Sequence, residues 1–162
     1  MVTHTARIGE IVVGKAPDLL EALALGSCVA VALYDPQNKI GSLSHVLLPK
    51  SSNYKEIDKV GKYADTAIPE AIRLTTAKGA NRERLRAKIA GGAKMFEMSG
   101  VNHLTVDVGA RNIEAVKTHL NEQNIPIVAD DTGENYGRTV SFNLDNFVFT
   151  IRLGSKKITK HI

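Results

Sequence analysis

A cysteine and a histidine are the two residues of this sequence whose chemistry pairs most readily. Cys28 is the sole cysteine of the 162-residue chain, and it follows Gly26-Ser27, where one apolar run stops and another begins. A sharp turn at this break would expose the thiol and aim the backbone N–H groups of Ser27 and Cys28 at one oxyanion. The alternative is an inert core residue, the more common role of a lone cysteine on an apolar strand. The pattern therefore marks Cys28 as a candidate nucleophile.

His45 is the candidate partner of that thiol. The segment Asp35-Pro36-Gln37-Asn38 predicts a turn, because proline presets φ and Asp and Asn side chains bond their own backbone. This turn folds the predicted strand 40–48 back along the predicted strand 28–34, which brings His45 within a few residues of Cys28. An adjacent imidazole would lower the pKa of the thiol and later protonate a leaving group. Since His45 alternates with apolar neighbours, the alternative is a core histidine.

Two further segments are candidates for binding substrate or a partner. Gly91-Gly92 follows the predicted strand 86–90, and the absence of side chains there lets a backbone or a ligand approach closely. Its alternative is a tight strand-to-helix turn. The segment Gly109-Ala110-Arg111-Asn112 leads into the second predicted helix, whose N-terminus would bind an anion or a carboxamide, with Arg111 and Asn112 as the candidate residues. Its alternative is Asn112 as a simple N-cap.

The apolar periodicity predicts the scaffold that must position these residues. Two helices are expected, over 64–78 with Pro69 inside and over 112–121. Because Pro69 removes a helical hydrogen bond, the first helix should start just before it or kink there. Strands are expected over 8–13, 19–25, 28–34, 40–48, 86–90, 127–129, 139–143 and 147–153. So few helices among so many strands favour a layered α/β fold, and the length favours one domain over residues 1–162.

Composition excludes several classes of protein. The net charge of +4 is small for a nucleic-acid-binding protein, so no nucleic-acid partner is expected. No apolar run approaches the roughly 18 residues of a membrane span, and the first residues lack the apolar region of a secretory signal. One cysteine and five histidines scattered along the chain do not form the closely spaced set of ligands typical of a zinc site, so no metal site is expected. These features indicate a soluble, cytoplasmic protein. The basic run Arg82, Arg84, Arg86 and Lys88, together with Arg73 and Lys78, is interpreted as a solvated face or, alternatively, as a surface for an acidic partner.

Several separated motifs occur in a recognisable order. They are Leu25-Gly26-Ser27-Cys28-Val29, His45 followed by Leu48-Pro49, Tyr63-Ala64-Asp65, Lys88-Ile89-Ala90-Gly91-Gly92-Ala93-Lys94-Met95-Phe96 and Gly109-Ala110-Arg111-Asn112. Together they resemble the CheD family, the chemoreceptor glutamine deamidases of bacterial and archaeal chemotaxis. The resemblance extends from about residue 9 to residue 153.

The resemblance implies a cysteine hydrolase that converts selected receptor glutamines to glutamates. It implies a layered α/β sandwich of mixed sheets with two main helices, similar to the catalytic domain of the cytotoxic necrotizing factor toxins. Cys28 maps to the nucleophile and His45 to the general base and acid, with no metal or organic cofactor required. Methyl-accepting chemotaxis receptors are the implied substrate, and a CheC-type phosphatase is the implied partner. A glutamyl methyl ester would be a lesser substrate of the same thioester route.

The sequence departs from the family pattern at two places. Some members carry a threonine six residues before the nucleophile, as the third member of a triad, and here that residue is Ala22. The group that orients His45 is then either missing or supplied by a backbone carbonyl or another side chain. This departure motivates an alternative function, a catalytically weak binding module that regulates CheC. The second departure is Asp131-Thr132-Gly133-Glu134, where a glycine pair is expected and the loop would differ in shape.

Overall fold

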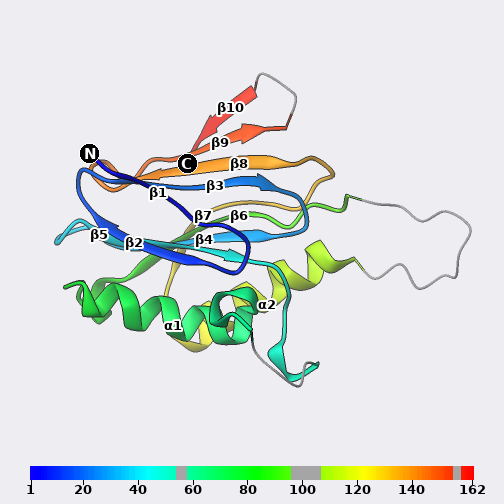
Figure 1. Cartoon of the computed structure of the whole chain (residues 1–162), viewed down its shortest axis with the longest axis horizontal. Helices are drawn as coiled ribbons and strands as arrows, with labels where there is room; N and C mark the ends of the chain where they lie inside the picture. The colour runs from blue at the N-terminus through cyan, green and yellow to red at the C-terminus, as the bar shows by residue number, and fades with distance from the viewer. Residues whose placement is uncertain (54–57, 96–106, 155–157) are drawn as a thin grey trace, which may run out of the picture.

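The computed structural model describes residues 1–53, 58–95, 107–154 and 158–162. Within these residues two mixed sheets stack on one another, and the two α-helices lie on the outer face of one of them (Figure 1). The predicted class, a layered α/β fold with mixed sheets and two main helices, is confirmed. The similarity to the toxin catalytic domain stays a prediction.

The inner sheet lies between the helices and the second sheet (Figure 1). Its order is β2-β5-β4-β6-β7, and only the β6–β7 pair is parallel. The bounds are Ile11–Lys15 for β2, Ile40–Val46 for β5, Val29–Asp35 for β4, Arg86–Gly91 for β6 and Ile127–Thr132 for β7.

The outer sheet has the order β1-β3-β8-β9-β10, in which only the β1–β3 pair is parallel. The bounds are Thr3–Thr5 for β1, Leu19–Leu25 for β3, Arg138–Asn143 for β8, Phe149–Leu153 for β9 and Ile158–His161 for β10. Neither β1 nor β10 is predicted from the sequence. Both are short, largely polar edge strands that are held by backbone pairing, so no apolar alternation marks them.

The helices are α1, Ala64–Ala77, and α2, Val108–Glu122. Because α1 begins at Ala64, it runs through Pro69. The first alternative, a helix that starts just before Pro69, is therefore wrong. The second helix begins four residues before its predicted start, because Asp107 caps it. Three short 3₁₀ turns, Ser51–Asn53, Val60–Lys62 and Arg82–Arg84, connect other elements. In the described part of the chain no helix is long and apolar enough to cross a bilayer.

Strand β4 is the centre of the molecule, and all seven of its residues are buried. Val29, Val31 and Leu33 pack toward the helices, while Ala30 and Ala32 belong to the core between the two sheets. Because both faces of β4 are covered, its sequence is a continuous apolar run with no polar alternation. The small alanines on the intersheet face let the sheets approach closely next to Cys28, which belongs to the same core.

Candidate active site

Cys28 lies directly before β4, at the turn that the Gly26-Ser27 break predicts. The next residue, Val29, pairs with Val46 of β5 on one side and Gly91 of β6 on the other. Cys28 is only 6 % exposed, but it lines a cleft of about 420 Å³. Ser27, Met95 and the start of α2 line the same cleft. The thiol is therefore a buried group at the floor of an open depression.

Three consecutive carbonyls around Cys28 are each held by a hydrogen bond from a different donor. The Gly26 carbonyl accepts from the N–H of Ala93 at 3.0 Å, and the Cys28 carbonyl accepts from the N–H of Gly92 at 2.8 Å. Between them, the Ser27 carbonyl accepts from Nδ2 of Asn112 at 2.9 Å. Donors in the segment at the end of β6 and in α2 thus hold the backbone on both sides of Cys28 in place.

Gly91 and Gly92 are the residues that allow this close approach. A Cβ on Gly91 would lie 2.3 Å from the Cys28 carbonyl oxygen, and a Cβ on Gly92 would lie 2.4 Å from Cγ1 of Ile113 in α2. Both glycines also have positive φ, at 112° and 68°, which favours glycine. Their contacts match the close backbone approach expected here, whereas direct contact with substrate or a partner stays a prediction. Phe96, the last residue of this motif, lies outside the described residues.

Arg111 and Asn112, in the first turns of α2, differ in exposure. Arg111 is exposed, whereas Asn112 is fully buried and donates from Nδ2 to the carbonyls of Ser27 and Leu47, both at 2.9 Å. The N-cap interpretation of Asn112 is wrong, because Asp107 is the N-cap and its Oδ1 accepts from the N–H of Ala110. Aspartate is a preferred N-cap residue, so Asp107 is the signal that would have placed the helix start correctly. Contact of either residue with substrate or a partner stays a prediction.

His45 projects from the same face of the inner sheet as Cys28. It pairs with Ala30 across the β4–β5 hairpin, and Cys28 is two residues before Ala30. Residues in this diagonal relation have Cβ atoms roughly 7–8 Å apart, within reach of long side chains. The hairpin expected from Asp35-Pro36-Gln37-Asn38 therefore brings the two candidate residues together.

A backbone carbonyl orients the imidazole of His45. Nδ1 lies 2.9 Å from the carbonyl oxygen of Ala6, which can only accept, so Nδ1 carries the proton. Nε2 is buried and has no hydrogen-bond partner among the described residues. Ala6 is held in turn, because its N–H donates to the Glu21 carbonyl of β3 at 2.8 Å. Of the alternatives opened by Ala22, the structure supplies the backbone carbonyl, and this leaves the Nε2 lone pair free to accept a proton.

Burial keeps both candidate side chains neutral near pH 7. It raises the pKa of the Cys28 thiol to about 11. It also lowers the pKa of His45, although the Ala6 carbonyl and the charge of Glu10 act in the opposite direction. The expectation that His45 lowers the thiol pKa is therefore wrong for this state, because desolvation dominates. The resting site is a neutral thiol beside a neutral imidazole.

Ile8 separates the thiol cleft from a second depression. That depression has a volume of about 500 Å³ and is lined by His45, Ala6 and Leu23, among others. Ile8 lines both spaces and is 50 % exposed, so an aliphatic side chain lies between the approach to the thiol and the approach to the imidazole. No sequence motif marks the role of the Ala6 carbonyl or this position of Ile8.

The loop at Asp131-Thr132-Gly133-Glu134 supports the segment that holds Cys28. The N–H of Gly133 donates to the Gly91 carbonyl, and the N–H of Lys94 donates to the Glu134 carbonyl, both at 2.9 Å. Gly133 and Glu134 have φ values of 88° and 60°. Glu134 therefore adopts the left-handed conformation that the second glycine of the expected pair would favour.

Comparisons with known proteins agree with these features. The family described as "CheD chemotactic sensory transduction" matches residues 47–153. A Thermotoga maritima protein named "Chemoreceptor glutamine deamidase CheD" is 48 % identical over 145 residues, which cover 90 % of this chain and 88 % of that protein. Two proteins named "Probable chemoreceptor glutamine deamidase CheD" are similarly related. The one from Lachnoclostridium phytofermentans is 48 % identical over 85 % of each chain. The one from Methanococcus vannielii is 47 % identical over 93 % of this chain and 94 % of its own. With such identity over most of its length, and with the motif residues gathered at one site, the chain belongs to the CheD family.

Proposed function

We propose that this chain is a chemoreceptor glutamine deamidase that works through a thioester on Cys28. The observation that carries the proposal is the arrangement at the start of β4. A lone thiol lies at a fixed turn in a cleft, and a histidine on the next strand has Nδ1 bound and an Nε2 with no hydrogen-bond partner in the described part of the chain. The names of the relatives support receptor glutamines as the substrate class.

The first half of the reaction forms the thioester. Nε2 of His45 takes the proton of the thiol as Sγ attacks the side-chain carbonyl carbon of glutamine. The carbonyl oxygen becomes an oxyanion, which the N–H groups of Ser27 and Cys28 stabilise. One such donor contributes about 2.7–4 kcal/mol in a measured protease. The C–N bond then breaks, and the imidazolium gives its proton to the departing ammonia.

The second half restores the enzyme. His45 takes a proton from water, whose oxygen attacks the thioester carbon. The C–S bond breaks, the sulfur recovers its proton from His45, and glutamate is left on the receptor. One amide and one water thus give one carboxylic acid and one ammonia. Besides the substrate and this water, the steps use side chains and backbone groups of this chain.

A cytoplasmic location is part of this proposal. The mechanism needs a free thiol, and cytosolic reductants keep a cysteine such as Cys28 reduced. The alternative of a catalytically weak binding module rests on Ala22, and the Ala6 carbonyl supplies the orientation that Ala22 cannot. The deamidase is therefore the favoured function.

A CheC-type phosphatase is the proposed partner. Arg111 is exposed at the start of α2, next to the residues Asp107 to Gly109 that line the thiol cleft. A partner that contacts Arg111 would cover the cleft entrance and so modulate deamidation. Calorimetric titration with CheC should show weaker binding for Arg111→Ala than for the unchanged protein. Equal affinity would remove this segment from the proposed interface.

The deamidase proposal is tested on a cognate receptor domain. Incubation with the unchanged protein should convert glutamine to glutamate at discrete positions, detected by mass spectrometry of the peptides. Cys28→Ala should lower the rate by about 10³-fold or more, because Cys28 is the sole thiol of the chain. Circular dichroism should show that the variant stays folded, since alanine fits the buried position. Substantial activity in Cys28→Ala would rule out the thioester route.

A further inference from the structure

Asn112 joins the two strand ends that carry the thiol and the imidazole. Its Nδ2 donates to the carbonyl of Ser27, directly before Cys28, and to the carbonyl of Leu47, two residues after His45. Both partners are acceptors, so the NH₂ group must face them and the side-chain orientation is determined. Asn112 is fully buried, and its Oδ1 has no donor among the described residues. A buried amide with an unpaired oxygen costs free energy, so packing alone is a poor account of asparagine here.

The bond to Ser27 acts on the peptide unit that ends in the N–H of Cys28. The Ser27 carbonyl and the Cys28 N–H belong to one planar peptide, and the only cis bond among the described residues is Ala16–Pro17. In a trans peptide these two groups point in opposite directions, so a donor that fixes the carbonyl also fixes the N–H. The same donor polarises the peptide and makes its N–H a stronger hydrogen-bond donor.

We infer that Asn112 is a positioning residue for deamidation, which holds the Cys28 N–H toward the oxyanion by binding the carbonyl of Ser27. The inference rests on the proposed function and deepens it. In this role Asn112 acts through the Ser27 carbonyl, since its own side chain is fully buried. The Gly26 carbonyl has an equivalent bond from the N–H of Ala93, which fixes the Ser27 N–H in the same manner. The side chain of Asn112 is the member of this pair that a substitution can remove.

The test compares a reaction that needs an oxyanion with one that does not. Asn112→Leu keeps the branched shape and the number of side-chain heavy atoms, and it donates no hydrogen bond. Deamidation by this variant should show a kcat about 10- to 100-fold lower, a part of the 10²–10³-fold cost of losing an oxyanion donor, with little change in KM. Alkylation of Cys28 by iodoacetamide displaces iodide from a saturated carbon and forms no oxyanion. Its rate and its pH dependence should therefore be unchanged.

Asn121→Leu is the matched control, because Asn121 lies on the exposed surface near the other end of α2. It should leave both reactions as they are in the unchanged protein. An unchanged kcat in Asn112→Leu would overturn the inference. Parallel changes in deamidation and alkylation would also overturn it, since they would show a general loosening of the site. Failure of the proposed function is distinct: the unchanged protein would then deamidate no faster than Cys28→Ala.

A second measurement observes the Cys28 N–H directly, first in the unchanged protein and then in Asn112→Leu. Because Cys28 is the sole cysteine, labelling cysteine with ¹⁵N gives a single amide resonance. A receptor peptide with an aldehyde in place of the glutamine carboxamide adds the thiol across its C=O, and the new oxygen occupies the oxyanion position. The amide proton of Cys28 should then move downfield, and it should move less in Asn112→Leu. If mass spectrometry shows that the adduct has formed but this resonance does not move, the inference is overturned.

Discussion

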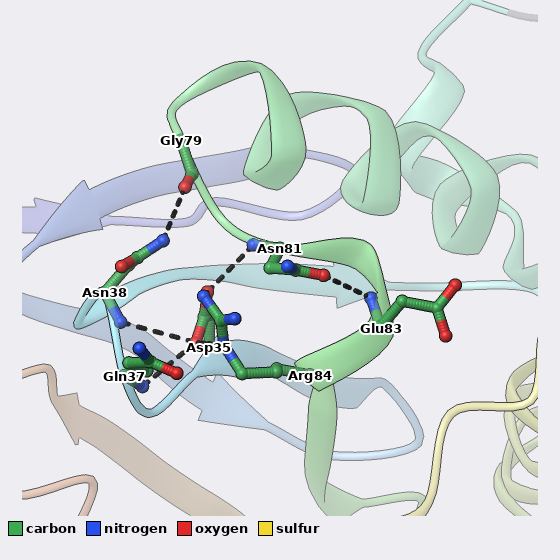
Figure 2. A network of polar contacts seen from close by, with 7 residues as sticks. All are labelled: Asp35, Gln37, Asn38, Gly79, Asn81, Glu83 and Arg84. Atoms are coloured by element: carbon green, nitrogen blue, oxygen red, sulfur yellow. Dashed lines mark hydrogen bonds and ion pairs between the residues drawn. The ribbon is translucent and has the colours of Figure 1, made fainter.

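The last residue of β4, Asp35, and the residue just before its first, Cys28, are both buried, but their surroundings differ in how they treat polar atoms. Oδ1 of Asp35 accepts from the N–H groups of Gln37 and Asn38 and from Nε of Arg84, at 2.9, 3.3 and 3.0 Å. Oδ2 accepts from the N–H of Asn81 at 2.8 Å and from the second Arg84 nitrogen at 3.1 Å. Figure 2 shows how the carboxylate joins the β4–β5 turn to the segment that precedes β6. Each oxygen of this carboxylate is therefore satisfied.

The opposite end of β4 leaves polar atoms without partners. Nε2 of His45 and Oδ1 of Asn112 are buried and unpaired among the described residues. The pKa values differ in the same manner. Burial opposes ionisation of Asp35, but Arg84 and three backbone N–H groups outweigh it and lower the pKa to about 2. For Cys28 nothing opposes burial, and the pKa rises to about 11. A fully paired buried charge holds elements together, whereas unpaired groups beside a cleft are available to a substrate.

The sharpest test of this contrast is His45→Gln. Its amide can still donate to the Ala6 carbonyl but cannot take a proton, so kcat should fall about 10²- to 10⁴-fold. The pKa of His45 is lowered by folding, so the histidine contributes stability above its unfolded pKa of about 6.5 and loses it as the pH falls through the folded value. Relative to the unchanged protein, His45→Gln should therefore be more stable at pH 5 than at pH 8.

Deamidation time courses and thermal melts at the two pH values measure both effects. A kcat close to that of the unchanged protein would show that His45 is a core histidine. It would also show that the unpaired Nε2 has no part in the reaction.

At the Asp35 end of β4 a substitution should lower stability and leave the deamidation rate unchanged. Asp35→Ala removes the acceptor of three backbone N–H groups and the partner of Arg84, so the free energy of unfolding should fall by about 3 kcal/mol at pH 7. Folding lowers the pKa of Asp35, so its contribution is present above about pH 4 and is lost as the pH falls toward 2. The difference between variant and unchanged protein should therefore shrink in acid, whereas the deamidation rate per folded molecule should be unchanged.

Urea denaturation at pH 7 and at pH 3 measures this difference. The control is Glu70→Gln, which removes an ion pair with Arg73 on the exposed face of α1. Such surface pairs contribute less than about 1 kcal/mol. An equal, small loss in the two variants would mean that the Asp35 network is not a structural centre.

The sequence predicts the contacts between residues close in sequence, both around Asp35 and around Cys28 and His45. Asp35 and the following turn residues predict the hairpin and its side-chain-to-backbone bonds, and the hairpin places His45 beside Cys28. Arg84 is not predictable in this way, because it reaches Asp35 from 49 positions away. The interpretation of the basic run as a solvated face is wrong for Arg84, for Arg82, which donates to the Gln123 carbonyl, and for Lys88, which donates to the Phe147 carbonyl.

The structural roles of two groups at the active-site end could not be predicted from the sequence. The Ala6 carbonyl orients His45 through its backbone, and any residue type supplies a carbonyl. Its position depends on β1, a three-residue strand with no apolar alternation. Asn112 acquires its bonds only when α2 packs against the ends of β4 and β5, which is a tertiary event. Residue types and local turns were thus predictable, whereas long-range backbone contacts were not.

The smallest expected effect belongs to Ala22→Thr. Ala22 is fully buried in the core between the sheets, and Nδ1 of His45 already donates to the Ala6 carbonyl. A threonine hydroxyl would find no free imidazole N–H, so kcat should change by less than about twofold. The two added heavy atoms overfill a close-packed site, which typically costs about 1–3 kcal/mol. Ala22→Ser adds one atom and should cost less. Deamidation rates and thermal melts of the two variants check both expectations. A large gain in kcat for Ala22→Thr alone would mean that the Ala6 carbonyl does not hold His45 during the reaction. His45 would then lack a long-range partner of the kind that Arg84 provides for Asp35.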